Sequence, residues 1–262
     1  MTDKLKLARD GDVAVVVLDD PPTLNALGPR LCAALVETFG ELAADGRARA
    51  AVLTGEGRAF SSGANLAEAA AALSAGQDLD LQSLVEGFYN PLARTLRDLP
   101  FPLVTAVNGT AAGIGCAFAL AGDLIVAAEG ASFNLAFRRV GLVPDGGSTW
   151  LLPRRVGLAR AMEMVLLGES VDAALALDWG LINRCVPAEA LMPEALALAR
   201  RLAEGPAALS SARRLLREGL DRPWSDQLAA EAIAQGAAGR TADFREGVAA
   251  FLQKREPKFR GE

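Results

Sequence analysis

The sequence contains no histidine and only one tyrosine, Tyr89. Histidine is the side chain that most often acts as general base near neutral pH, and it is the commonest ligand of transition metals. Its absence excludes Ser-His-Asp and Cys-His catalysis, and we expect no metal site. Any acid–base chemistry must come from carboxylates, lysine, the tyrosine or cysteine.

Cysteine is also scarce. The three cysteines, Cys32, Cys116 and Cys185, lie far apart and form no CxxC pair. An odd number of widely spaced cysteines does not fit a disulfide framework or a zinc site. We therefore expect reduced thiols in a cytoplasmic protein.

Strong charge of either sign is absent. The 262 residues carry 32 acidic and 27 basic side chains, which are interspersed and give a net charge of −5. This balance excludes a typical nucleic-acid or membrane-surface binder, so we expect neither partner. Half of the chain is hydrophobic (51%), which is enough for a sizeable core.

No signal peptide is expected, because the first 13 residues are charged early and lack an apolar centre. Residues 101–122 carry no charge and are long enough to cross a bilayer, but Pro102, Asn108 and four glycines interrupt them. A buried strand, a glycine-rich turn and a buried helix explain this stretch better than a membrane span.

Strand-like and helix-like segments alternate in the first part of the chain. Residues 13–20, 48–57, 102–107 and 123–133 are rich in small and β-branched residues, whereas residues 28–46 and 81–99 have helical spacing. The alternation predicts an α/β fold with a largely buried sheet. After Leu158 the chain reads as helices, with residues 181–187 as the one short strand. We divide the chain into an α/β core, residues 1–200, and a helical region, residues 201–262.

Two strands are followed by small-residue turns and helix starts, near Gly63–Ala64 and near Gly113–Gly115. Free backbone N–H groups at such points attract negative charge. One N–H from each turn could converge on a carbonyl oxygen as an oxyanion hole. Tight packing of strand against helix is the alternative explanation of the glycines. Neither stretch fits the GxGxxG nucleotide pattern.

The motif "FSSGANL" resembles a loop of the crotonase (enoyl-CoA hydratase/isomerase) superfamily, and "AVNGTAAGIGCAFALAGD" resembles the second glycine-rich segment of that family. The resemblance extends from "VVVLDDPPTLNAL" to the end of the chain. It implies ββα repeats that form a core sheet, a C-terminal helical trimerisation region, and homotrimers or dimers of trimers. It also implies an acyl-CoA thioester substrate, with CoA as part of that substrate and no separate cofactor.

The resemblance further implies a set of site residues. The oxyanion donors would be the backbone N–H groups of Ala64 and Ile114. Asn65 stands where the family usually has aspartate, so the role of that carboxylate is open here. The residues placed against the CoA thioester are Ala26, Leu27, Ser62, Asn65, Leu66, Phe137, Lys258 and Phe259. The last two lie in the basic tail, which would act on the same or a neighbouring subunit.

Hydratases of the family use two glutamates, and the corresponding positions here are Ala117 and Phe137. Neither side chain can transfer a proton, so hydration by the usual mechanism is not expected. The isomerase branch of the family, which includes enoyl-CoA isomerases and ring-opening isomerases of phenylacetate degradation, resembles "GLVPDGGSTWLLPRRVG" instead. In that branch an acid at the position of Asp145 is catalytic.

Asp145 therefore has two interpretations. An aspartate between proline and glycine is a common turn residue and a good N-cap for the helix that follows. As a catalytic group it would shuttle one proton, and an apolar wall of Val143, Phe137 and Trp150 would raise its pKa. We favour catalysis, and an enoyl-CoA isomerase. An enoyl-CoA hydratase, an acyl-CoA thioester or halide hydrolase, and a non-catalytic acyl-CoA binder are the alternatives.

The remaining candidates carry weaker signals. Glu68 is expected on a charged helix surface. Tyr89 lies in a helix where pocket lining and core packing are both open. Ser61 and Ser62 lack a base partner, so neither is expected to be a nucleophile.

Overall fold

A six-stranded sheet forms the centre of the computed structural model, which describes residues 3–262. Its order is β1-β2-β3-β5-β7-β10; β1 is antiparallel to β2, and the other neighbours are parallel. The strands are β1 (Leu5–Asp10), β2 (Val13–Leu18), β3 (Ala50–Gly55), β5 (Leu103–Val107), β7 (Leu124–Ala128) and β10 (Arg184–Val186). The residues of β3 and β5 are all buried, as expected for parallel strands covered on both faces.

A second sheet of short strands stands beside the first one, in the order β4-β6-β8-β9. Its members are β4 (Ala59–Ser61), β6 (Thr110–Ala112), β8 (Ser132–Asn134) and β9 (Val171–Asp172). Consecutive strands of the two sheets, followed by a helix, build the repeats β3-β4-α2 and β5-β6-α5. The predicted α/β fold with ββα repeats is confirmed. Two details of the prediction were wrong. The two small-residue turns contain the short strands β4 and β6, and β9 is a second strand after Leu158, where only one was expected.

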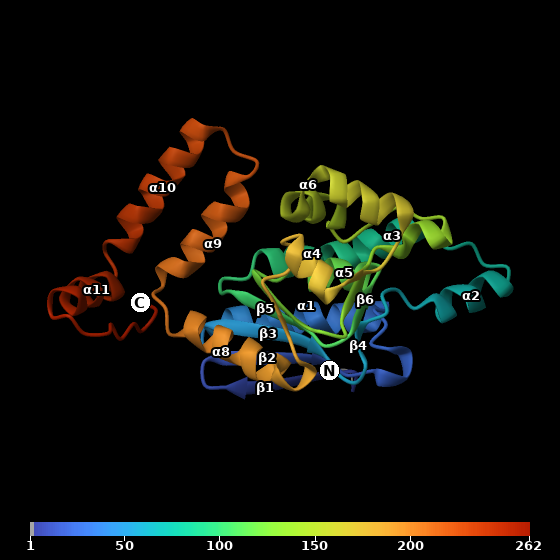
Figure 1. Cartoon of the computed structure of the whole chain (residues 1–262), viewed down its shortest axis with the longest axis horizontal. Helices are drawn as coiled ribbons and strands as arrows, with labels where there is room; N and C mark the ends of the chain where they lie inside the picture. Colours follow the sequence, from blue (N-terminus) through green and yellow to red (C-terminus); the bar gives the residue numbers. More distant parts are fainter. Residues whose placement is uncertain (1–2) are drawn as a thin grey trace.

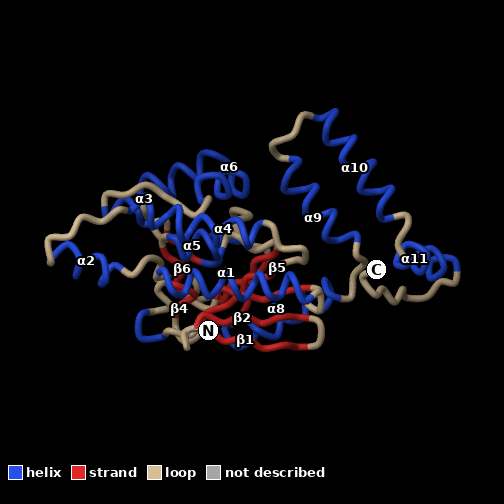
Figure 2. The backbone as a smooth tube through the Cα atoms, turned by 180° about the vertical axis from the view of Figure 1, so that it is seen from behind, coloured by secondary structure: helices blue, strands red, loops and turns tan. Residues whose placement is uncertain are grey.

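Helices cover both faces of the main sheet (Figures 1 and 2). On one face lie α1 (Pro29–Asp45), α4 (Asn90–Arg97) and α5 (Ile114–Ala119), which share the larger hydrophobic core with the sheet. On the other face α8 (Leu191–Ala203) packs against alternate residues of β3, β5 and β7. The remaining elements of this part are η1 (Pro21–Thr23), α2 (Leu66–Ser74), α3 (Leu81–Leu84), η2 (Val85–Tyr89), η3 (Ala136–Val140), α6 (Ser148–Leu167), α7 (Ala173–Asp178) and η4 (Ala188–Ala190).

Three helices extend away from the core at the end of the chain (Figure 1). They are α9 (Ala208–Gly219), α10 (Trp224–Ala238) and α11 (Ala242–Leu252). Their direction leaves large apolar side chains such as Trp224, Ile233 and Phe251 exposed.

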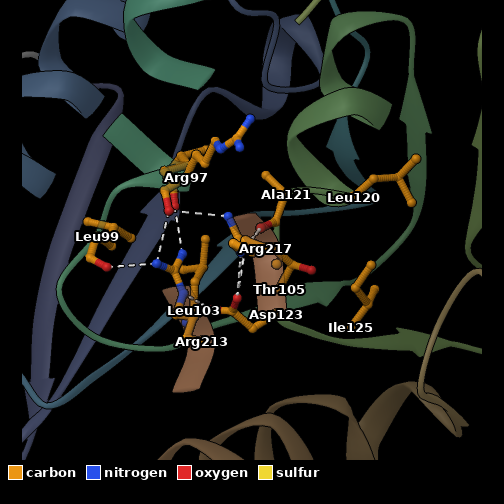
Figure 3. Close-up of polar contacts among 12 residues, drawn as sticks. Arg97, Leu99, Leu103, Thr105, Leu120, Ala121, Asp123, Ile125, Arg213 and Arg217 are labelled. Carbon is orange, nitrogen blue, oxygen red and sulfur yellow. Dashed lines mark hydrogen bonds and ion pairs between the residues drawn. The ribbon is translucent and has the colours of Figure 1, made fainter. Parts of the chain in front are cut away.

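A charged cluster at Asp123 joins α9 to the core (Figure 3). Arg213 Nε and Arg217 Nη2 each lie 2.7 Å from an oxygen of Asp123. Arg213 also donates to the carbonyl of Leu99, and Asp123 accepts the N–H of Leu103 at 2.8 Å. The two arginines therefore fix one turn of α9 to the loop before β5 and to the start of β7.

Within residues 3–262, no helix combines the length and the apolar character needed to cross a bilayer. The uncharged stretch 101–122 forms β5, β6 and α5, and most of it lies in the core.

Substitution of Asp123 tests the join between α9 and the core. Asp123→Ala leaves two partly buried guanidinium groups without their carboxylate. Removing one partner of a buried charge network costs roughly 3–5 kcal/mol, and partial exposure reduces that figure here to about 2–3 kcal/mol. Urea unfolding should show this loss, whereas Asp98→Ala, at the exposed end of α4, should change the free energy of unfolding by less than about 0.5 kcal/mol. Equal stability of the two variants would contradict this account of the cluster.

Candidate active site

The first turn of α5 lies at the centre of the candidate site. Gly113 precedes the helix with φ +50°, and its N–H donates to Asn134 O at 2.8 Å. The N–H of Ile114, the first helical residue, donates to no acceptor within residues 3–262. It is one of the N–H groups that a helix start leaves unpaired, and it is therefore available to a ligand.

The loop after β4 brings a second free N–H to the same place. Gly63 lies against the first turn of α5: a Cβ on Gly63 would be 2.6 Å from Ala112 O and 3.5 Å from Ile114 N. Only glycine permits this approach, and its φ of +90° also favours glycine. The N–H of the next residue, Ala64, donates to no acceptor in the described part of the chain. The two predicted oxyanion donors thus come from neighbouring backbone segments.

Residues 20–28 frame this loop, and Asn25 is a residue that the sequence reasoning missed. Its buried side chain donates to Ala59 O at 2.8 Å and accepts from Asp20 N at 2.8 Å. Leu24 and Asn25 have φ of 58° and 57°, which is uncommon outside glycine and is maintained here by these bonds. A polar residue inside the apolar run "TLNAL" was the signal for a buried structural amide.

Asp145 lies on the turn that enters α6, next to α5. A Cβ on Gly146 would be 2.3 Å from Ile114 Cδ1 and 3.1 Å from Ala117 Cβ, so the turn rests on these two side chains. The N-cap of α6 is Gly147, without a side-chain cap. It is the backbone carbonyl of Asp145 that accepts, from Ser148 N at 3.0 Å and Ser148 Oγ at 2.7 Å. The carboxylate of Asp145 therefore does not cap the helix.

The Asp145 carboxylate is poorly solvated. Its Oδ1 is buried and has no hydrogen-bond partner within residues 3–262. Burial raises the pKa of Asp145 from 3.8 to about 6. The expected apolar wall is wrong in part: Val143 is 81% exposed, and the Trp150 ring lies between Arg97 and Arg154, at 4.8 and 4.0 Å. Ile114 and Ala117 are the apolar neighbours of the turn instead.

The two positions of the hydratase acids lie close to this centre. Ala117 is fully buried beneath Gly146, and Phe137 is 8% exposed with its ring tip 3.9 Å from a Cβ placed on Gly113. Both positions are apolar surfaces against α5. They provide no second carboxylate beside Asp145.

Most of the residues predicted to contact the CoA ester lie around the two loops. Leu27 N donates to Gly63 O at 2.7 Å, and Ala26 N donates to Thr23 Oγ1 at 3.2 Å. Ser62 Oγ donates to Thr23 O at 2.9 Å. Asn65 is the N-cap of α2, because its Oδ1 accepts from Glu68 N. Leu66 begins α2 and is exposed.

Lys258 and Phe259 lie elsewhere in the chain. Lys258 N donates to Glu246 Oε1, and the Phe259 ring lies near Gly247 of α11. The C-terminus and α2 are at opposite ends of the molecule in both views (Figures 1 and 2). A role for these two residues at the site requires a neighbouring subunit.

Tyr89 and Glu68 each contact a residue that surrounds the candidate site. Tyr89 is buried and donates from its hydroxyl to Leu27 O at 3.1 Å. Burial, and then the charges of Cys32, Asp145 and Glu68, raise the pKa of Tyr89. Glu68 is exposed as expected, and it accepts from Asn65 Nδ2 at 2.7 Å.

A cavity of about 680 Å³ lies beside the site, between α4, α6 and α9. Its lining includes Gly146 and Trp150, but Ala64, Ile114 and Asp145 are not part of it. The free N–H groups and the buried carboxylate lie outside this cavity, so the first turn of α5, and not the cavity, is the candidate site. No group of three or more acidic or cysteine side chains within residues 3–262 could hold a metal ion.

Comparison with known proteins identifies the family. The sequence matches the enoyl-CoA hydratase/isomerase family over residues 8–262. The chain therefore belongs to this family, the crotonase superfamily, as its motifs predicted. It is 45% identical to a probable enoyl-CoA hydratase of Rhodobacter capsulatus and 43% identical to the 1,2-epoxyphenylacetyl-CoA isomerase of Escherichia coli K12, with 95% of each chain covered in both cases.

A solved structure agrees with this assignment. The crystal structure of a putative enoyl-CoA hydratase from Streptomyces coelicolor has a TM-score of 0.93 at 37% identity, covering 99% of this chain and 94% of that one. The fold and the order of its elements are therefore those of the crotonase family.

The raised pKa of Asp145 predicts a pH-dependent stability. Because the folded-state pKa of about 6 exceeds the ordinary 3.8, the protonated carboxyl stabilises the fold below pH 3.8, and this contribution is lost as the pH rises to about 6. Asp145→Asn has no such titration. Urea unfolding of both proteins from pH 4 to 8 should show the wild type losing stability relative to the variant up to about pH 6 and no further. Parallel curves would exclude a raised pKa.

Proposed function

We propose that this protein is an enoyl-CoA isomerase, which moves a double bond along the acyl group of a CoA thioester. Asp145 is its single acid–base group, and the N–H groups of Ala64 and Ile114 stabilise the thioester enolate. CoA is part of the substrate, and no separate cofactor is required.

One observation supports this proposal above the others. A buried, unpartnered carboxylate oxygen of Asp145 lies on a turn that contacts the residue bearing a free N–H, Ile114. A carboxylate with a pKa of about 6 is a stronger base than an exposed aspartate and is still largely ionised at neutral pH. These are the requirements for removing a proton next to a thioester.

The reaction follows from these groups. The Asp145 carboxylate takes a proton from C2 of a 3-enoyl thioester, and the electron pair of the C–H bond moves toward the thioester oxygen. The resulting oxyanion accepts hydrogen bonds from Ala64 N and Ile114 N. Protonated Asp145 then returns its proton to C4; the C3–C4 double bond becomes a single bond, a double bond forms between C2 and C3, and the thioester carbonyl is restored. One carboxylate suffices because no atom is added.

Hydration is the first alternative, since the relative in Rhodobacter capsulatus is named a probable enoyl-CoA hydratase. Addition of water requires one group to activate water and one to protonate carbon. Ala117 and Phe137 occupy the positions where hydratases of this family have those acids, and both are buried hydrocarbon side chains. The arrangement therefore favours isomerisation.

Two further alternatives remain chemically distinct. In a thioester or halide hydrolase, Asp145 would act as nucleophile or direct water, and free CoA or a covalent aspartyl adduct would form. In a non-catalytic binder, CoA esters would bind without exchange of the C2 proton. The name of the Escherichia coli relative places 1,2-epoxyphenylacetyl-CoA among the substrates to be assayed.

We also propose that the chain forms homotrimers or dimers of trimers. The exposed apolar side chains of α9–α11, including Trp224, Ile233 and Phe251, are a surface that association would bury. Light scattering should give a mass of three or six times 27.3 kDa. A 27.3 kDa species at micromolar concentration would contradict the proposal.

The central prediction concerns Asp145→Asn. The amide keeps the size of the side chain but cannot take the proton from C2. Double-bond migration on a 3-enoyl-CoA should therefore fall by at least about 10³-fold, which is the size of effect expected for loss of a general base. Binding of the CoA ester should stay within about threefold, because the substitution preserves the size and shape of the side chain. Turnover is followed spectroscopically and binding by calorimetry.

Two comparisons make this assay decisive. Glu163→Gln removes an exposed carboxylate of α6 and should retain full activity. Substantial turnover by Asp145→Asn would refute its role, and robust hydration of a 2-enoyl-CoA by the wild type would refute the argument from Ala117 and Phe137. Deuterium exchange at C2 and release of free CoA distinguish the isomerase from the binder and the hydrolase.

A further inference from the structure

Tyr89, the only tyrosine, lies at the last position of a π-helical turn, η2 (Val85–Tyr89). Its side chain is buried at 3% exposure, and its hydroxyl donates to Leu27 O at 3.1 Å. π-Helical turns are rare and occur often at functional sites. This one places a phenol beneath the loop that frames the candidate site.

The bond to Leu27 continues to the oxyanion donor. Leu27 N donates to Gly63 O at 2.7 Å. The carbonyl of Gly63 and the N–H of Ala64 belong to one planar peptide group, in which they point in opposite directions. Whatever fixes Gly63 O therefore fixes the direction of Ala64 N–H. A hydrogen bond to the carbonyl also polarises the N–H of the same peptide.

Other bonds restrain the neighbouring residues but not this peptide. Ser62 N donates to Leu24 O at 2.8 Å, and Gly63 N donates to Ser61 Oγ at 3.1 Å. Within residues 20–28, the side chain of Asn25 donates to the carbonyls of Ala59 and Phe60 in the strand β4. Leu27 is the residue that holds the Gly63–Ala64 peptide, and the carbonyl of Leu27 is held by Tyr89.

We propose that Tyr89 is a positioning residue of the oxyanion hole: its hydroxyl holds Leu27, and Leu27 holds the Gly63–Ala64 peptide so that Ala64 N–H points toward the thioester oxygen. This inference rests on the proposed role of Ala64 as an oxyanion donor. Tyr89 does not transfer a proton. Burial and three neighbouring acidic groups raise its pKa, so the phenol stays protonated and remains a donor.

The test uses Tyr89→Phe, which removes the hydroxyl and keeps the ring. Loss of a whole oxyanion donor reduces kcat by roughly 10²–10³-fold, so misorientation of one donor should reduce it by about 10–100-fold. KM for the CoA ester should change by less than about threefold. A second readout is the red shift in the absorbance of a bound 2,4-dienoyl-CoA, which reports polarisation of the thioester carbonyl by the two N–H groups and should become smaller.

Thr105→Val is the matched control. It removes an equally buried hydroxyl, which donates to Ala119 O at the end of α5 away from Ile114. It should lower the melting temperature about as much as Tyr89→Phe while leaving kcat and the red shift unchanged. All assays are made at a temperature where circular dichroism shows each variant folded.

The outcomes separate the two proposals. A normal kcat and a full red shift in folded Tyr89→Phe would overturn the positioning role, even if the wild type is an isomerase. If the wild type lacks isomerase activity, the red shift still tests the position of Ala64 N–H: a smaller shift in Tyr89→Phe, with a normal shift in Thr105→Val, supports the inference on its own. A reduced shift in Thr105→Val as large as in Tyr89→Phe would attribute the effect to general loosening and overturn it.

Discussion

The candidate site depends on backbone contact at the first turn of α5. Two segments that are far apart in sequence meet this turn where a side chain would not fit: the loop at Gly63 and the turn at Gly146. The first contact brings the loop that carries Ala64 N–H next to Ile114 N. The second contact places the turn at Asp145 and Gly146 against the side chain of Ile114. Because each contact is with backbone or a packed core side chain, neither segment can shift without displacing the helix.

The same contacts determine the electrostatics of Asp145. A turn that rests on Ile114 and Ala117 leaves one carboxylate oxygen of Asp145 buried and without a hydrogen-bond donor in the described part of the chain. The ionised form is disfavoured, and the group becomes a base with a pKa of about 6. A glutamate in place of Ala117 would replace hydrocarbon with charge at this point. The apolar residue at that position and the raised pKa of Asp145 are therefore parts of one arrangement.

The sequence predicted the class of fold, because hydrophobic alternation and glycine-rich motifs are local signals. The roles of Ala64, Ile114 and Asp145 came from the resemblance to the crotonase family and stay predictions. The sequence did not predict β4, β6 or β9, since strands of two or three residues carry too little pattern to be distinguished from turns. It placed Val143 against Asp145, whereas the turn directs Val143 to the surface. The sequence could not show whether the Asp145 carboxylate caps α6 or stays free, because either the backbone carbonyl or the side chain of one residue can accept the unpaired N–H groups at the start of a helix.

The residues around the site divide into a fixed inner part and an exposed outer part. Asn25, Tyr89 and the first turn of α5 are buried, and the side chains of Asn25 and Tyr89 donate hydrogen bonds to the backbone carbonyls of Ala59 and Leu27. Such fixed surroundings suit the pre-arranged donors that the proposed oxyanion hole requires. The helix α2 has no buried residue and carries exposed side chains such as Leu66 and Leu73. Because α2 contributes nothing to the buried core, changes on it are expected to leave the two N–H donors and Asp145 in place. Residues that set the rate of the proposed isomerisation are therefore to be sought among the buried residues and not on α2.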